Sequence, residues 1–347
     1  KLISLEFLKM KFPILNNYTY LDTARSGLLY DELLSWRKSH DLEFLEGGSQ
    51  FRVNHEEFLD KVRKEVSYFF KTDNHPVYLT QNFSLGFKSL LNLINLDQTF
   101  LLIKNDYPSI INQVQTSGFK HFFVDNSHDL EHQILNRINK YKPNVLVLSI
   151  VQYINGTFLD LTFIKKIKKL FPNLLIIADG TQFCGTKEFD FNNSDIDILI
   201  SSGYKWLLGG YGNGFIILRN NVVNDFLKNK IFLNQILELG HYDTLNFGSL
   251  LFSLKKLSDY GLSNIEKSIN KLSHYAKKKF IDKGLLDDQT IKRVNHSNIF
   301  NLKGDVLLYT KLTENKIICS QRGGGIRISL NFYNKKEEVD YLLSFFK

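Results

Sequence analysis

Lys205 lies between an apolar run and a glycine-rich segment, in the stretch SSGYKWLLGGYGNGF of residues 201–215. Lysine is one of the residue types least often buried, so a lysine directly after a buried strand either reaches solvent or serves chemistry. Asp179 ends another apolar run, in LLIIADGTQ. A carboxylate and an amine at neighbouring strand ends form either a buried ion pair or a site where the amine attacks a carbonyl group.

Polar and aromatic side chains also follow the other apolar runs: Asn82, Ser84, Tyr107, Gln182, Ser202 and Tyr204. A hydroxyl such as that of Ser84 and the free N–H groups of a helix start form an anion site, with ordinary helix capping by Ser84 as the alternative. Tyr107 is suited to stacking on a flat ligand or to covering the core. An ion pair alone leaves this gathering of side chains unexplained.

The elements that must position these residues alternate along the chain. Strands are expected at 75–80, 99–104, 144–151, 173–179, 195–202 and 214–219, with helices at 84–94 and 161–171. Such alternation predicts a mostly parallel sheet with helices on both sides. In sheets of this kind, small-molecule ligands bind beyond the carboxyl ends of the strands. The polar and aromatic side chains named above follow those ends.

The pattern changes from about residue 250. A long helical stretch over 250–284 is followed by short strands and a final helix near 335–346. We therefore expect a large α/β domain over residues 15–245. A smaller C-terminal α+β domain is expected over residues 246–347, together with residues 1–14.

Composition limits the classes of function. The net charge is +8, but the lysines are spread along the chain and accompany no nucleic-acid-binding motif, so no nucleic-acid partner is expected. Two cysteines form neither a disulfide framework nor a zinc pattern, and no metal site is predicted. No apolar run is long enough to cross a bilayer and no secretory pattern opens the sequence. A cytoplasmic protein without membrane partners is expected.

Several motifs in order along the chain resemble one family. ADGTQ and SSGYKWLLGGYGNGF are similar to the D-x-x-Q and S-x-[HY]-K-W-x-x-G-P-x-G-x-G signature of class V aminotransferases, the cysteine desulfurase-like pyridoxal phosphate enzymes of fold type I. YLDTARSG, SIVQYINGTFLDL and GGGIRISLNFYNKKEEVDYLL resemble further segments of that family. The resemblance implies an aspartate aminotransferase-like large domain with a seven-stranded sheet and a homodimer with shared active sites.

The same resemblance implies roles for individual residues. Lys205 would form the Schiff base with pyridoxal 5′-phosphate and move protons, and Asp179 would pair with the pyridinium nitrogen. The remaining cofactor-binding residues would be Asn82, Phe83, Ser84, Tyr107, Tyr153, Gln182, Ser202, Tyr204 and, from the other subunit, Thr244. Arg327 would bind the α-carboxylate of an amino acid. Arg322 is close enough in sequence to help or to bind a second acid group of the substrate, and Arg25 is a further candidate on the substrate side.

The reaction is left open at this point. The family resemblance favours an aminotransferase, and the alternative is a β-eliminating C–S lyase or a cysteine desulfurase-like enzyme. A non-catalytic binding protein on the same fold is a third reading. A desulfurase needs a nucleophilic thiolate on a mobile loop. Cys319 lies in the apolar run KIICSQR, without the longer loop of desulfurases, and Cys184 is expected to pack in the core.

Overall fold

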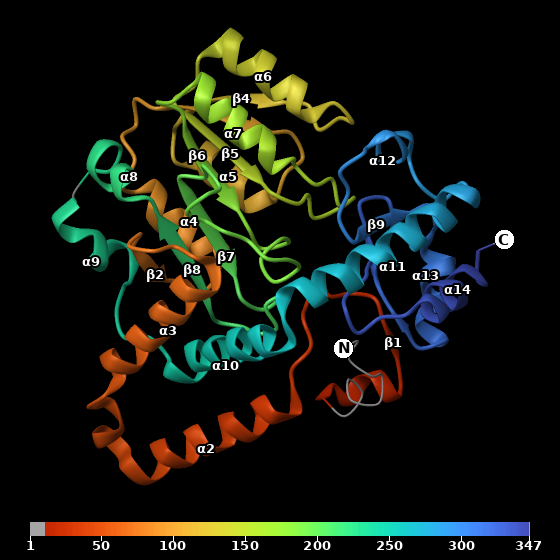
Figure 1. Cartoon of the computed structure of the whole chain (residues 1–347), viewed down its shortest axis with the longest axis horizontal. Helices are drawn as coiled ribbons and strands as arrows, with labels where there is room; N and C mark the ends of the chain where they lie inside the picture. Colours follow the sequence, from red (N-terminus) through yellow and green to blue (C-terminus); the bar gives the residue numbers. More distant parts are fainter. Residues whose placement is uncertain (1–10, 229, 347) are drawn as a thin grey trace.

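A seven-stranded sheet forms the centre of the larger part of the molecule (Figure 1). The computed structural model describes residues 11–228 and 230–346. The strand order is β2-β8-β7-β6-β5-β3-β4. The strands are β2 (Val77–Leu79), β3 (Thr99–Ile103), β4 (Lys120–Val124), β5 (Val145–Ser149), β6 (Leu175–Asp179), β7 (Ile198–Ser202) and β8 (Gly214–Leu218). Only β8 runs antiparallel to its neighbours, so the predicted mostly parallel, seven-stranded sheet is confirmed.

Helices cover both faces of this sheet. In β5, Leu146 and Leu148 belong to one buried cluster while Val145 and Val147 belong to another, as the alternation of side chains along a strand requires. Helices α3 (His55–Phe70), α6 (Leu130–Tyr141) and α7 (Leu161–Leu170) supply the first cluster, and α4 (Phe83–Leu91) and α5 (Pro108–Thr116) supply the second. Burial on both faces explains why the central strands read as continuous apolar runs.

The order of the strands creates a point where the chain changes direction across the sheet. After β3 the chain adds β4 at one edge, whereas β5, β6 and β7 are added on the other side of β3. The carboxyl ends of β3, β5, β6 and β7 therefore all lie at the same edge of the sheet, next to this switch point. Ligands of open α/β sheets bind at such a point.

The smaller part contains an antiparallel sheet in the order β11-β12-β9, formed by β9 (Ile299–Leu302), β11 (Ser320–Arg322) and β12 (Gly325–Ser329). Near the N-terminus, β1 (Thr19–Tyr20) pairs in parallel with β10 (Ile317–Ile318), so the start of the described chain lies beside the C-terminal elements (Figure 1). The domain limits expected from the sequence stay a prediction, and residues 1–10 lie outside the described part.

The helical stretch expected over 250–284 is two helices rather than one. They are α10 (Thr244–Tyr260), which packs on α3, and α11 (Leu262–Asp282). Gly261 separates them with a φ of +80°, a left-handed conformation that glycine adopts without steric cost. The remaining helices are α2 (Asp31–Gly47), α8 (Asn220–Asp225), α9 (Leu233–Leu237), α12 (Asp288–Lys292), α13 (Val306–Glu314), α14 (Lys336–Leu343) and the 3₁₀ turns η1 (Pro13–Asn16), η2 (Gly48–Arg52) and η3 (Lys230–Phe232).

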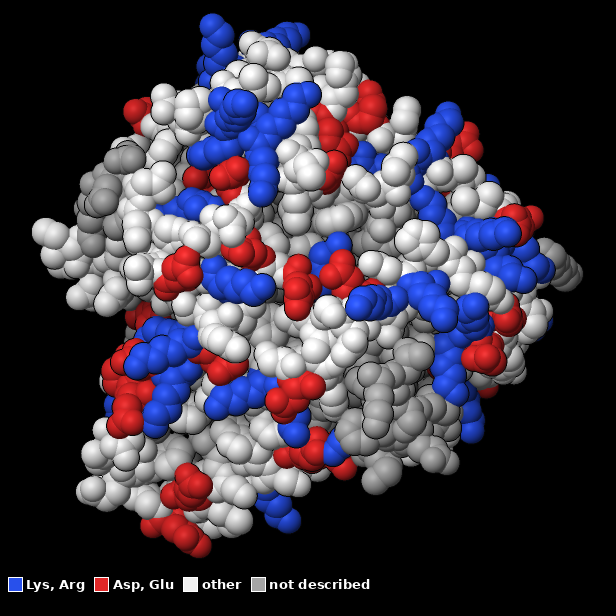
Figure 2. All heavy atoms as spheres, in the orientation of Figure 1, with Lys and Arg blue, Asp and Glu red and all other residues white. Residues whose placement is uncertain are grey.

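The surface carries both signs of charge. On the face drawn in Figure 2, Lys and Arg side chains lie beside Asp and Glu side chains over much of the area. Within residues 11–228 and 230–346, none of the helices has both the length and the apolar character needed to cross a membrane.

Candidate active site

A cavity of about 520 Å³ lies beyond the carboxyl ends of the central strands. This volume is in the range typical of small-molecule sites. Its lining includes Asn82, Phe83, Ser84, Tyr107, Tyr153, Asp179, Gln182, Ser202, Tyr204 and Lys205. The fold thus brings together side chains from the ends of β2, β3, β5, β6 and β7, as the sequence predicts for this edge of the sheet.

The amine of Lys205 and the carboxylate of Asp179 are both withdrawn from water, with 8% and 6% of each residue exposed. Burial lowers the pKa of Lys205 to about 7, although the nearby Asp179 opposes the shift. Burial also raises the pKa of Asp179 to about 6, opposed by hydrogen bonds from Thr181. The Thr181 backbone N–H donates to Oδ1 of Asp179 over 2.8 Å. Near neutral pH Asp179 is therefore mostly a carboxylate, and the Lys205 amine loses its proton far more readily than an ordinary lysine.

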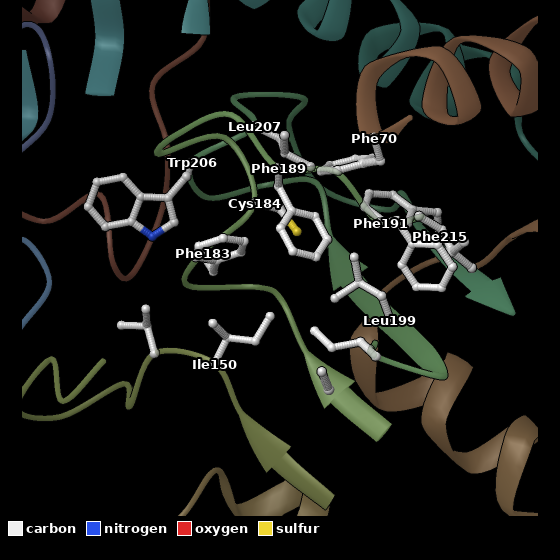
Figure 3. Close-up of a cluster of buried hydrophobic side chains, with 14 of the residues drawn as sticks. Phe70, Ile150, Phe183, Cys184, Phe189, Phe191, Leu199, Trp206, Leu207 and Phe215 are labelled. Carbon is white, nitrogen blue, oxygen red and sulfur yellow. The ribbon is translucent and has the colours of Figure 1, made fainter. Parts of the chain in front are cut away.

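The amide of Gln182 is fixed in one orientation by two neighbours. The indole Nε1–H of Trp206 donates to Gln182 Oε1 over 2.8 Å, and Gln182 Nε2 donates to the carbonyl of Ala24 over 2.9 Å. These two bonds fix the orientation of the amide and leave one Nε2–H of Gln182 free to donate to a ligand in the cavity. Trp206 is 1% exposed, and Figure 3 shows it beside the aromatic cluster that also contains Phe183.

The start of α4 forms the anion-binding end of the cavity. Asn82 caps this helix, since its side chain accepts from the Leu85 N–H over 3.0 Å. The alternative of capping by Ser84 is wrong, because α4 already begins at Phe83 and the Ser84 hydroxyl lies 2.7 Å from Ser109 Oγ. Ser202 Oγ accepts from the Phe83 N–H over 2.8 Å, so the Ser202 hydroxyl proton is left to donate. A hydroxyl and a helix N-terminus facing one cavity suit an anion.

Aromatic rings line the other walls. Tyr107 contacts Tyr153 edge to face, with 5.6 Å between ring centroids, and Tyr204 stacks on Tyr211 at 4.8 Å. The amine of Lys205 lies 5.9 Å from the Tyr107 ring and 5.5 Å from the Tyr204 ring. A flat ligand bound to Lys205 would have an aromatic surface within reach.

Asp106 is a buried residue of the site that the sequence analysis did not select. Its carboxylate accepts hydrogen bonds from the Ser149 N–H at 2.9 Å, the Ser149 hydroxyl at 2.6 Å and the Tyr107 N–H at 2.7 Å. Asp106 thereby joins the ends of β3 and β5 and holds the backbone that carries Tyr107. The signal in the sequence was an aspartate three residues after an apolar strand, a looser form of the signal that identified Asp179 at the end of its strand.

Arg327 lies in β12 and is 1% exposed. Its Nη2 lies 3.4 Å from Oδ1 of Asp22, and its Nη1 donates to the carbonyl of Tyr153 over 3.0 Å. The Nε of Arg327 is buried and has no hydrogen-bond partner in the described part of the chain. An unpartnered N–H on a buried guanidinium is suited to a carboxylate ligand. Asp22, 305 residues away in sequence, was not selected from the sequence.

Arg327 and the three remaining predicted residues are not among the residues that line the cavity. Arg322 and Arg25 are exposed, and the guanidinium of Arg322 lies 5.1 Å from the Tyr153 ring centroid. Thr244 is buried at the first residue of α10, with its hydroxyl 2.9 Å from His40 Nε2. Its expected role in the partner's site stays a prediction.

Both cysteines of the chain are buried away from the cavity. Cys184 packs among Phe183, Phe189 and Leu199, as expected (Figure 3). Cys319 belongs to the core of the smaller part. Burial raises the pKa of the Cys184 thiol, and burial together with the charge of Asp22 raises the pKa of Cys319 to about 12. Neither thiol is therefore a ready nucleophile at neutral pH.

A larger cavity of about 710 Å³ lies beside α3 and the segment 234–242. Four of the charged groups along it form one network centred on Arg63. Arg63 donates to Glu56 over 2.8 Å, to Asp60 over 2.6 Å and to Glu238 over 3.1 Å. None of the residues that line the cavity around Lys205 lines this larger cavity.

Comparison with known proteins was made by sequence and by structure. The model of the aminotransferase class-V family matches residues 43–342. A probable cysteine desulfurase of Ureaplasma parvum serovar 3 is 23% identical over 393 aligned positions, covering 98% of this chain and 96% of that protein. A putative cysteine desulfurase of Plasmodium berghei is 30% identical over 95 residues, which cover 25% of this chain and 18% of that protein.

Solved structures share the same fold. Two structures of C-DES match with TM-scores of 0.86 and 0.85 at 18% identity, covering 97% and 96% of this chain and 98% of each C-DES chain. One is a variant with glycine covalently linked to the PLP cofactor, and the other is the cystine C–S lyase in complex with its reaction product, cysteine persulfide. The apo cysteine desulfurase of Thermococcus onnurineus NA1 has a TM-score of 0.82 at 15% identity, covering 98% of this chain and 96% of that one.

Proposed function

Given that the chain belongs to the aminotransferase class-V family, we propose that it is a pyridoxal phosphate-dependent enzyme that cleaves a carbon–sulfur bond of an amino acid by β-elimination. The donor set of the cavity fits this cofactor. Lys205 presents an amine to an aldehyde, Asp179 presents a carboxylate to a ring nitrogen, and Ser202 with the start of α4 presents donors to a phosphate.

Each of three residues has a separate role in the proposed reaction. When bound, the cofactor supplies a ring that withdraws the electron pair left by a bond broken at Cα. Asp179 holds a proton on the ring nitrogen. The Thr181 backbone N–H fixes Oδ1 of Asp179 by a 2.8 Å hydrogen bond. Lys205, whose pKa is lowered by burial, takes the Cα proton at Nζ. Arg327 orients the substrate carboxylate with its free Nε–H.

The choice of C–S bond cleavage replaces the aminotransferase that the sequence resemblance favoured. The relatives compared above carry the names of cysteine desulfurases and of a cystine C–S lyase, which support the alternative reading. Loss of the sulfur substituent follows from the same step at Cα, because an electron pair at Cα expels a leaving group at Cβ.

One observation separates a lyase from a desulfurase that carries sulfur on its own cysteine. Cys184 and Cys319 are the only cysteines of the sequence, and both are buried with raised pKa values. The segment before Arg327 is a tight hairpin, with Arg322 paired to Gly325 and Gly323 and Gly324 in the turn. The proposal therefore assigns the sulfur to a released product and not to an enzyme persulfide.

The test uses purified protein loaded with pyridoxal phosphate and a panel of L-cysteine, L-cystine and L-alanine with a keto acid. We expect pyruvate, ammonia and a released sulfur product from the sulfur amino acids. Lys205→Ala should abolish product, and the double variant Cys184→Ala/Cys319→Ala should keep activity within about twofold of the wild type. Dependence on either cysteine, or amino-group transfer to the keto acid as the main reaction, would contradict the proposal.

A homodimer and a cytoplasmic location complete the proposal. Thr244 lies outside the cavity of its own chain, with its buried hydroxyl on His40, and its proposed role in a neighbouring subunit rests on the family resemblance. Analytical ultracentrifugation of the loaded enzyme would measure the state of association, and Thr244→Ala should weaken cofactor binding if the sites are shared.

A further inference from the structure

The loop that carries Lys205 is closed at its base by Asn213. This lysine loop, residues 203–213, joins β7 to the antiparallel strand β8. Asn213 is completely buried, and its carbonyl accepts from the Gly203 N–H over 3.0 Å. The Gly209 N–H donates to the Gly203 carbonyl over 2.9 Å. The backbone between these two glycines therefore forms a ring that contains Lys205 and closes on Asn213.

The side chain of Asn213 holds the part of the loop that follows the lysine. Its Nδ2 donates to the carbonyl of Gly209 over 2.8 Å and to that of Gly210 over 3.2 Å. Its Oδ1 faces Gly203 so closely that a Cβ at Gly203 would lie 2.0 Å from this oxygen. The oxygen is buried and has no hydrogen-bond partner within residues 11–228 and 230–346. Asn213 therefore holds the loop through its N–H groups.

The same amide ties the lysine loop to helix α10. Nδ2 of Asn213 also donates to the carbonyl of Asn246, in the first turn of α10, over 3.0 Å. Nδ2 carries two hydrogens, which the three carbonyl oxygens share. The helix is a firm support, because Asp243 caps it with a 2.8 Å hydrogen bond and α10 packs on α3. Farther along α10, the Ser253 hydroxyl donates to the carbonyl of Leu207 in the loop.

The lysine loop does not hold this shape by local preference. Leu208 has a φ of +56°, a left-handed conformation that residues with a side chain seldom adopt. Its N–H donates to the Lys205 carbonyl over 3.2 Å, so the turn at Leu208 sets where the lysine backbone lies. Such a turn persists only where surrounding contacts enforce it. The hydrogen bonds of Asn213, which begin at the next residue, are contacts of this kind.

We propose that Asn213 is the positioning residue of Lys205: its side-chain amide holds the lysine loop against α10, so that the amine meets the aldehyde of pyridoxal phosphate. Asn213 is not among the residues that line the cavity, and it acts through the loop. The inference rests on the bond of Lys205 to the cofactor in the proposed function, and it does not depend on which substrate bond is cleaved. Loss of the amide should misplace the amine and leave the other contacts of the cavity in place.

Two forms of the cofactor separate positioning of the amine from general damage to the site. Pyridoxal phosphate can bond to Lys205 through its aldehyde, whereas pyridoxamine phosphate carries an amine instead and binds by its other contacts alone. Fluorescence titration of the apoprotein measures both dissociation constants. Asn213→Leu keeps the size of the side chain and removes its N–H donors. It should weaken pyridoxal phosphate about tenfold, the effect of one buried hydrogen bond, and pyridoxamine phosphate by less than about twofold.

A matched control is Asn298→Leu. Asn298 is also buried, and its Nδ2 donates to the Leu330 carbonyl over 2.7 Å in the smaller part of the molecule. This variant should lose stability in urea as Asn213→Leu does, but it should leave both dissociation constants within about twofold of the wild type. If Asn213→Leu does not fold, Asn213→Ser carries the test. It keeps one donor, so it should weaken pyridoxal phosphate by a smaller factor and again more than pyridoxamine phosphate.

The outcomes distinguish this inference from the proposed function. Equal weakening of the two ligands by the Asn213 variants, or unchanged binding of pyridoxal phosphate, would overturn the inference. Lys205→Ala should bind the two ligands with similar affinity. A wild-type protein that did the same would contradict the role of Lys205 itself, and with it any residue proposed to position the amine.

Discussion

Replacing the buried lysine by a side chain of similar size without charge, Lys205→Met, should stabilise the protein after removal of its cofactor. Lys205 is 8% exposed, and its pKa falls from 10.5 to about 7 in the folded protein because burial disfavours the charged amine. The unfolded chain holds a proton on this amine at pH 8.5 and the folded chain does not. Folding at that pH must therefore release a proton, which costs free energy.

The cost has a definite size and pH dependence. It is about 1.4 kcal/mol for each pH unit below 10.5, down to about pH 7, and thus about 2.7 kcal/mol at pH 8.5. Because the folded-state pKa is lowered, wild-type stability rises with pH across this window. Lys205→Met lacks the titration, so its advantage should shrink by about 1.4 kcal/mol per pH unit and vanish above about pH 10.5.

Urea denaturation of both apoproteins at a series of pH values measures the difference directly. Groups that titrate equally in the two proteins cancel in this difference. A difference that does not change between pH 7.5 and 10, or that grows with pH, would mean that Lys205 is charged in the folded protein. The amine would then be unable to accept the Cα proton without first losing its own, and the assigned role at Nζ would fail.

Two further substitutions probe contacts that hold the site in place. Trp206→Phe removes the donor to Gln182 Oε1 from a buried pair at 2.8 Å, so pyridoxal phosphate should bind the apoprotein about tenfold more weakly in a fluorescence titration. An unchanged affinity would mean that Gln182 needs no such restraint. Asp22→Asn leaves the buried guanidinium of Arg327 without a carboxylate, so the free energy of unfolding in urea should fall by about 3 kcal/mol. A carboxylate ligand such as L-alanine should recover part of that loss, and stability equal to the wild type would show that water compensates Arg327.

Much of the cavity was predictable because its residues follow apolar strands. Lys205, Asp179, Ser202 and Tyr107 each come at or just after the end of such a run, and parallel strands place their carboxyl ends at one edge.

The break at Gly261 was missed because helical periodicity continues through both flanking segments. A single glycine in a helical pattern is compatible with a continuous helix, and only the backbone conformation decides otherwise.

The amino-acid sequence by itself determined the alternating elements, the polar strand ends and the family signature around Lys205. Tertiary structure alone decided which distant residues complete the site: Asp22 against Arg327, Asp106 against Ser149, and Trp206 against Gln182. The physical reason is that apolar periodicity records which face of an element is buried, a local property. Pairing between segments far apart depends on strand register and packing, which no single segment encodes.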